Sequence, residues 1–175
     1  MIEQHSRRIV ITGFMGAGKT STARALARRL DCMMLDLDEF ITSRNGISVP
    51  EIIKRGGVRY FRQVETEALR ASLKEASARI ISLGGGAWAF ARNRALITSH
   101  QAFTVWLDAS FDLCWQRISS NAELRPLARD FAAARKLYHD RLSSYALADL
   151  RVRVSDNECA EQLAAEIAEA LSAST

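Results

Sequence analysis

Apolar runs of strand length alternate with amphipathic stretches of helix length along nearly the whole chain. The apolar runs predict five strands, at residues 9–11, 32–36, 79–83, 103–107 and 150–154. Helical spacing follows each strand, at residues 21–30, 38–44, 58–76, 93–99, 111–119, 132–146 and 157–172. A short extra helix is expected between a capping box, Ser48 to Glu51, and the pair Gly56 and Gly57. Strands separated by helices predict an α/β fold, a five-stranded parallel sheet in a three-layer α/β/α arrangement.

The absence of repeats, linkers and low-complexity tracts favours a single domain over residues 1–175. No apolar run approaches the roughly 18 residues of a membrane span. The first residues run directly into the first strand, which leaves no room for a signal peptide. Cys32, Cys114 and Cys159 are far apart and lack metal-ligand spacing, so reduced thiols are expected. A cytoplasmic protein is the expectation.

The strongest local signal is the glycine-rich segment at residues 13–20, between the first strand and the first helix. It matches the pattern G-x-x-x-x-G-K-[ST]. Backbone N–H groups of such a loop converge on phosphate oxygens, at the positive end of the helix. Lys19 can reach the terminal phosphates, and the Thr20 hydroxyl can ligate Mg²⁺. The expected nucleotide-binding residues in this segment are Gly16, Ala17, Gly18, Lys19, Thr20 and Ser21.

Two carboxylates, Asp36 and Asp38, stand at the end of the second strand. Asp36 suits Mg²⁺ or its water shell, and Asp38 could accept a hydrogen bond from a substrate hydroxyl. Either could instead cap the helix that begins near Glu39. Asp108 also follows apolar residues, but a capping role at the next helix explains it better than a metal site does.

Two further features follow in order along the chain. Arg62 and Glu65 are three apart on a helix, and on its own this spacing is most typical of a solvated ion pair. The alternative is that Glu65 orients Arg62 toward an anionic substrate. Gly84, Gly85 and Gly86 end the third strand, and three glycines in a row favour close backbone approach to a ligand.

The helical pattern is lost over about residues 120–131, which predicts a lid. Arg125 in this segment could place a cation on the transferring phosphoryl group. Arg141, on the following helix, is a second candidate for the substrate anion.

Composition narrows the classes of function. The 24 basic and 20 acidic side chains give a net charge of only +4, and 48% of the residues are hydrophobic. That balance is globular. No dense basic run and no basic patch interleaved with aromatics is present, so nucleic-acid binding has little support.

Taken in order, these pieces resemble the shikimate kinases, small P-loop kinases of aromatic amino-acid and chorismate biosynthesis. The resemblance rests on the glycine-rich loop, the pair Asp36 and Asp38, and residues 46–52, Gly-Ile-Ser-Val-Pro-Glu-Ile. It continues with Phe61-Arg62-x-x-Glu65, the triple glycine with Ala87, Arg125-Pro126-Leu127, and Arg141-x-x-x-Tyr145. It covers about residues 9–171. Trp88 and Phe90, after the triple glycine, are bulkier than the small aliphatic residues usual there.

The resemblance implies a role for each part. The reaction would transfer the γ-phosphoryl group of ATP to the 3-hydroxyl of shikimate, with Mg²⁺ held by Thr20 and Asp36. Asp38 would orient or deprotonate the hydroxyl, and Arg125 would close over ATP. Shikimate would be held by Asp38, Arg62, Gly84, Gly85, Gly86 and Arg141. A monomer is expected.

Two other interpretations stay open. One is a related kinase that acts on another carboxylate-bearing polyol, such as gluconate. The other is a catalytically silent binding module, which is disfavoured because Lys19, Asp38 and the lid arginine are all present.

Overall fold

The computed structural model describes residues 7–74, 77–119 and 130–173. Its five strands form one sheet in the order β2-β3-β1-β4-β5, and every neighbouring pair is parallel. The strands are β1 (Ile9–Thr12), β2 (Met33–Asp36), β3 (Ala78–Ser82), β4 (Phe103–Ala109) and β5 (Leu150–Val154). The helices are α1 (Lys19–Arg29), α2 (Leu37–Asn45), α3 (Val49–Lys74), α4 (Ala91–Ser99), α5 (Phe111–Ser119), α6 (Phe131–Tyr145) and α7 (Ala160–Ala173).

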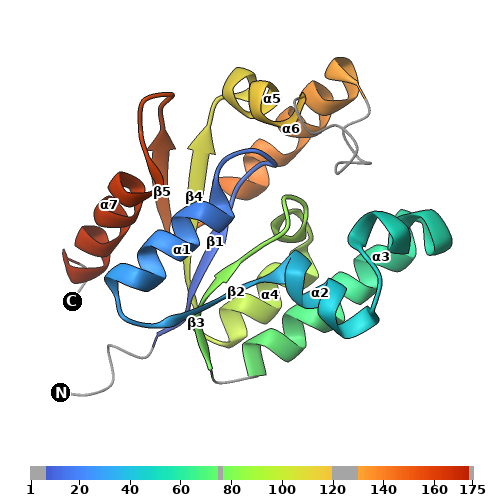
Figure 1. Ribbon diagram of the computed structural model, residues 1–175, viewed down its shortest axis with the longest axis horizontal. Helices are drawn as coiled ribbons and strands as arrows, with labels where there is room; N and C mark the ends of the chain where they lie inside the picture. Colours follow the sequence, from blue (N-terminus) through green and yellow to red (C-terminus); the bar gives the residue numbers. More distant parts are fainter. Residues whose placement is uncertain (1–6, 75–76, 120–129, 174–175) are drawn as a thin grey trace.

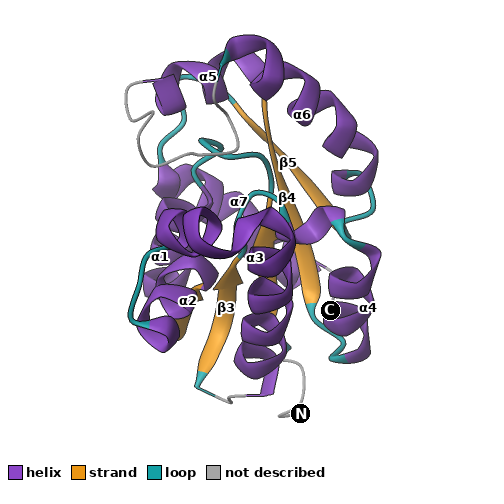
Figure 2. Cartoon of the chain, turned by 90° about the vertical axis from the view of Figure 1, so that its right-hand side faces the viewer, coloured by secondary structure: helices purple, strands orange, loops and turns teal. Residues whose placement is uncertain are grey.

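Helices cover both faces of the sheet, as the sequence predicts. α1 and α7 pack against each other on one face, and α3 and α4 lie on the other (Figure 1). All four residues of β1 are buried, whereas the edge strands β2 and β5 keep exposed positions. This is why the central strands are almost continuously apolar in sequence. α5 and α6 lie toward the end of the sheet at which the strands finish (Figures 1 and 2). The predicted three-layer α/β/α architecture is confirmed.

The predicted break in the third helical region is also confirmed. Ser48 caps α3, because its Oγ accepts a hydrogen bond from the backbone N–H of Glu51 at 3.4 Å. Within α3, Gly57 has φ 77° and ψ 170°, which interrupts the helix between its short first part and its long second part.

Several boundaries differ from the prediction by one to three residues, as at α1, which begins at Lys19 rather than at 21. α7 begins at Ala160 rather than at 157. The predicted lid ends earlier than 131, because Phe131 is the first residue of α6 and the Asp130 side chain caps that helix on Ala133 N. Asp130 is therefore an N-cap, a residue type that helix starts favour. The rest of the predicted lid, including Arg125, lies outside the described residues.

Candidate active site

The glycine-rich loop joins β1 to α1, and its glycines are required by backbone conformation and, at Gly13 and Gly16, also by space. Gly13, Gly16 and Gly18 all have positive φ, of 143°, 81° and 93°. A Cβ at Gly13 would stand 2.6 Å from the carbonyl oxygen of Leu107, and one at Gly16 would stand 2.8 Å from that of Cys114. The loop is therefore held tightly against β4 and α5, with its backbone at the start of α1.

Lys19 is buried at the first position of α1, and its Nζ donates a hydrogen bond to the Phe14 carbonyl at 2.9 Å. This contact folds the ammonium group back over the loop whose backbone would receive the phosphates. Lys19 thus lies where the sequence pattern expects a cation for a nucleotide's terminal phosphates.

Asp36 connects this loop to α2. Its Oδ2 accepts a hydrogen bond from the Thr20 hydroxyl at 2.5 Å, and its Oδ1 accepts from the N–H groups of Asp38 and Glu39 at 3.0 and 3.2 Å. The Asp36 carboxylate therefore both caps α2 and contacts Thr20. Two hard oxygen donors lie side by side, a set that suits Mg²⁺, which takes one or two protein ligands and completes its shell with water and phosphate.

The triple glycine after β3 lies among the side chains that the sequence predicts to bind the substrate. An added Cβ would stand 2.7 Å from Asp38 Oδ1 at Gly84, 3.0 Å from Met15 N at Gly85, and 2.5 Å from Arg62 Nη2 at Gly86. None of the three glycines has a positive φ. Glycine is required at these positions because the side chains of the site come close to the backbone. This reason adds to the predicted one, which was the close approach of a ligand.

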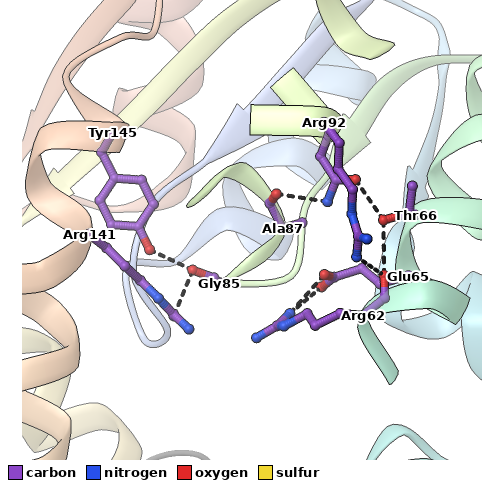
Figure 3. Close-up of polar contacts among 9 residues, drawn as sticks. Arg62, Glu65, Thr66, Gly85, Ala87, Arg92, Arg141 and Tyr145 are labelled. Carbon is purple, nitrogen blue, oxygen red and sulfur yellow. Dashed lines mark hydrogen bonds and ion pairs between the residues drawn. The ribbon is translucent and has the colours of Figure 1, made fainter. Parts of the chain in front are cut away.

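Arg62 and Glu65 form a buried pair, so their interpretation as a solvated ion pair is wrong. The side chains are only 8% and 1% exposed, and Arg62 Nη1 lies 2.8 and 2.7 Å from the two carboxylate oxygens (Figure 3). Burial raises the pKa of Glu65, and the attraction of Arg62 opposes that rise. A charge in such a place is stabilised only by its partner.

Arg141 reaches the same place from α6. Its Nη1 donates to the Gly85 carbonyl at 2.9 Å, and Tyr145 Oη donates to the same oxygen at 2.5 Å (Figure 3). Burial lowers the pKa of Arg141 and raises that of Tyr145 to about 12. A Cβ at Gly86 would stand 2.9 Å from Arg141 Nη2, so the two guanidinium groups converge on one glycine.

An open cavity of about 880 Å³ lies along the carboxyl ends of the strands. Its wall includes residues 16–22, Asp36, Asp38, Gly84 and Gly85. Ligands of open parallel sheets bind at this edge. Arg62 and Arg141 stand beside the cavity at Gly86 and are not part of its wall. The sequence-predicted residues are thus brought to one edge of the sheet, apart from Arg125, whose place is not described.

Sequence reasoning missed several residues of this site. Arg117 donates to the Gly16 carbonyl at 3.0 Å and lines the cavity, and Tyr145 braces Gly85 as described above. Asn93 is fully buried and donates to the Ala87 carbonyl at 2.9 Å. Arg117 carried no motif that could have singled it out. Tyr145 is part of the spacing Arg141-x-x-x-Tyr145 noted in the sequence, but no role was predicted for it.

Asp108 does not have its predicted role as the cap of α5. Its Oδ2 accepts from Arg151 Nε and Nη2 at 2.8 and 2.6 Å, across the β4–β5 pair. The cap of α5 is Ser110, whose Oγ accepts from Leu113 N at 3.2 Å.

Comparisons with known proteins decide the family. The shikimate kinase family profile matches residues 15–172. The chain belongs to the shikimate kinase family. A curated shikimate kinase from Ruegeria pomeroyi is 40% identical over 169 residues, which cover 94% of this chain and 85% of that protein. One from Geobacter sulfurreducens is 39% identical over 170 residues, covering 95% and 92%.

The fold agrees with that membership. The solved shikimate kinase from Acinetobacter baumannii in complex with shikimate superposes with a TM-score of 0.88. It is 28% identical, and the match covers 97% of this chain and 94% of that one. In the described residues no helix is long and apolar enough to cross a membrane.

Proposed function

We propose that this protein transfers the γ-phosphoryl group of ATP to the 3-hydroxyl of shikimate, yielding shikimate 3-phosphate and ADP in aromatic amino-acid biosynthesis. Membership of the shikimate kinase family supports this function. The observation that carries it is the convergence of Arg62 and Arg141 on Gly86, beside Asp38 and the phosphate loop. Two guanidinium groups at one point fit a carboxylate-bearing acceptor. We propose a cytoplasmic monomer that uses Mg²⁺.

The chemistry asks for positioning and charge stabilisation. The 3-oxygen of shikimate attacks the γ-phosphorus, the bond to the β–γ bridging oxygen breaks, and ADP leaves. The hydroxyl proton passes to Asp38 or, where Asp38 only orients the hydroxyl, to water. Gly16, Ala17, Gly18 and Ser21 present the backbone to the phosphates, and Lys19 supplies a cation there.

Thr20 and Asp36 would hold Mg²⁺, which when bound neutralises charge on the β- and γ-phosphate oxygens. Arg62 and Arg141 would bind the carboxylate of shikimate. Gly84, Gly85 and Gly86 have no side chains and so leave room for the groups that bind it. Arg125 is proposed as the lid arginine over ATP. Each role is a proposal that the following assay tests.

Steady-state kinetics with ATP and Mg²⁺ test the function. We expect turnover on shikimate and little on gluconate, the alternative acceptor. Arg62→Ala and Arg141→Ala should each raise the KM for shikimate about tenfold or more while the KM for ATP stays near that of the wild type, because each removes a charged hydrogen-bond donor. Lys19→Ala should lower kcat for every acceptor.

Arg28→Ala is a matched control. Arg28 is 66% exposed in an ion pair with Glu161 between α1 and α7, so its loss should leave the kinetics unchanged. Activity on gluconate without activity on shikimate would overturn the proposed substrate. Unchanged shikimate kinetics in both arginine variants would overturn the carboxylate assignment.

A further inference from the structure

Within the described part of the chain, hydrogen bonds hold the guanidinium group of Arg62 through Nη1 alone. Nη1 takes both contacts to Glu65, and Nη2 faces Gly86, where the acceptor's carboxylate is proposed to bind. Nε is buried and has no hydrogen-bond partner among the described residues. Because both contacts to Glu65 pass through one nitrogen, these hydrogen bonds alone do not fix the plane of the guanidinium group. Another contact must fix the direction of Nη2.

Aromatic rings supply that contact. The centroid of the Phe90 ring lies 5.2 Å from Arg62 Cζ, and that of the Phe61 ring lies 5.0 Å from it. Phe61 is buried, so packing accounts for its place. Phe90 is 37% exposed, so burial of its own surface explains its place poorly. The electron-rich face of a ring attracts a guanidinium group, and the attraction grows when the cation is desolvated, as Arg62 is.

Phe90 is itself tied to α3. It stands between the 3₁₀ turn Ala87–Ala89 and α4, and Arg92, two residues on, donates from Nη2 to the Arg62 carbonyl at 2.8 Å (Figure 3). Arg92 Cζ also lies 5.6 Å from the Phe90 ring. The Thr66 hydroxyl is 2.9 Å from the same carbonyl and 2.8 Å from Asn93 Oδ1. The segment that carries Phe90 is therefore bound to the backbone of Arg62 itself.

We propose that Phe90 is a positioning residue, which holds the guanidinium group of Arg62 turned toward Gly86 so that Nη2 meets the carboxylate of the acceptor. This inference deepens the proposed function and rests on it. It assigns the bulky residue after the triple glycine to acceptor binding, through Arg62, with no contact of its own to the reacting atoms.

A double-mutant cycle tests the assignment. Phe90→Leu keeps an apolar side chain and removes the ring, and we expect the KM for shikimate to rise about threefold to thirtyfold, the range of a ring–guanidinium contact. kcat and the KM for ATP should stay near those of the wild type. Phe90→Tyr keeps the ring and should have the wild-type KM for shikimate. In an Arg62→Ala background, Phe90→Leu should change the dissociation constant of shikimate less than twofold, because its effect passes through Arg62.

Phe40→Leu is the matched control. It removes a comparable contact, with Arg44 Cζ 5.4 Å from the ring, away from Arg62. Its KM for shikimate should be unchanged. Wild-type kinetics in Phe90→Leu would overturn the proposal, as would effects of Phe90→Leu and Arg62→Ala that multiply, since independent effects mean that Phe90 does not act through Arg62.

A measurement without substrate separates this inference from the proposed function. The Nε–H proton of Arg62, assigned by its loss in Arg62→Lys, should exchange slowly with water in the wild type and at least severalfold faster in Phe90→Leu. In Phe40→Leu and Phe90→Tyr it should stay slow. If the wild type fails to phosphorylate shikimate, the proposed function fails, and the exchange rates still decide whether Phe90 holds Arg62. Equal exchange in the wild type and Phe90→Leu would overturn the positioning role.

Discussion

Gly84 and Gly86 are only two positions apart in the chain, yet each leaves space for a different part of the site. The space beside Gly84 holds Asp38, with Oδ1 2.7 Å from an added Cβ. The space beside Gly86 holds both guanidinium groups, at 2.5 and 2.9 Å. Gly86 has φ −112° and ψ −13°, a backbone conformation open to any residue. A methyl group at either position therefore acts by displacing its neighbours, and the two displacements have different kinetic consequences.

We expect Gly86→Ala to raise the KM for shikimate about tenfold or more while kcat falls less, because it moves both arginines. Gly84→Ala should mainly lower kcat, since it displaces the carboxylate proposed to meet the hydroxyl. A one-ångström misplacement of a reacting group can cost about a hundredfold in rate. Steady-state kinetics of the pair measure the split, and the KM for ATP serves as the internal reference. An identical pattern in both variants would contradict the separation of roles.

At this scale the sequence identified the residue types but not their surroundings. The spacing of Arg62 and Glu65 is the same for a solvated pair and for a buried one, and only the packing of α3 against the triple glycine decides between them. Asp108 illustrates the same point, because its partner Arg151 is distant in sequence and adjacent only through the β4–β5 register. Tertiary contacts of this kind leave no local pattern.

At the scale of an element, α3 depends on its interruption at Gly57. The values φ 77° and ψ 170° fall in a region that is essentially restricted to glycine. Nothing lies within 4 Å of an added Cβ, so a substitution there would suffer backbone strain alone. Gly46, at the end of α2, has φ 69° and ψ 4°, the left-handed region that asparagine tolerates. Gly46 and Gly57 therefore lie on either side of the short first part of α3, which begins at Val49.

Gly57→Asn should therefore lower the free energy of unfolding by about 1–3 kcal/mol, the cost of a residue in that region. Gly46→Asn should lower it by only a few tenths of a kcal/mol. Urea unfolding of the two variants beside the wild type gives the comparison. Equal losses would show that the interruption in α3 relaxes to an ordinary conformation at no cost.

The helices and strands themselves were readily predicted. The periods of the apolar pattern identified each strand, and paired glycines identified the interruption of α3, because these signals are local. Helix starts were less accurate. α7 begins at Ala160, three residues later than predicted. The polar residues before it form a turn in which Glu158 accepts a hydrogen bond from the backbone N–H of Ser155.

At the scale of the whole molecule, one edge of the sheet carries both halves of the proposed reaction. The glycine-rich loop follows β1, Asp36 is the last residue of β2 and the triple glycine follows β3, and parallel strands bring their carboxyl ends together. The sequence predicted this meeting because parallel topology alone requires it. The apolar pattern alone could not show that Arg62 from α3 and Arg141 from α6 both reach Gly86, because that depends on how the two helices pack.

Different side chains are proposed to bind the nucleotide and shikimate. Each ligand should therefore stabilise the folded protein through its own group of side chains. A ligand at about a hundred times its dissociation constant stabilises the native state by about 2.7 kcal/mol. For a chain of this size that raises Tm by about 5–10 °C. We expect ADP with Mg²⁺ and shikimate each to produce such a rise in thermal unfolding of the wild type.

Substitutions in the two groups of side chains should affect the two increases in Tm separately. Lys19→Ala should lose most of the ADP effect and keep the shikimate effect, because Lys19 folds over the phosphate loop. Arg141→Ala should do the reverse, because Arg141 stands at Gly86 on the acceptor side. Omitting Mg²⁺ should reduce only the ADP rise, since Thr20 and Asp36, which contact each other, are proposed to hold the ion beside the phosphates. If either variant lost both rises together, the donor and acceptor groups would be one interdependent site, contrary to their placement on different elements.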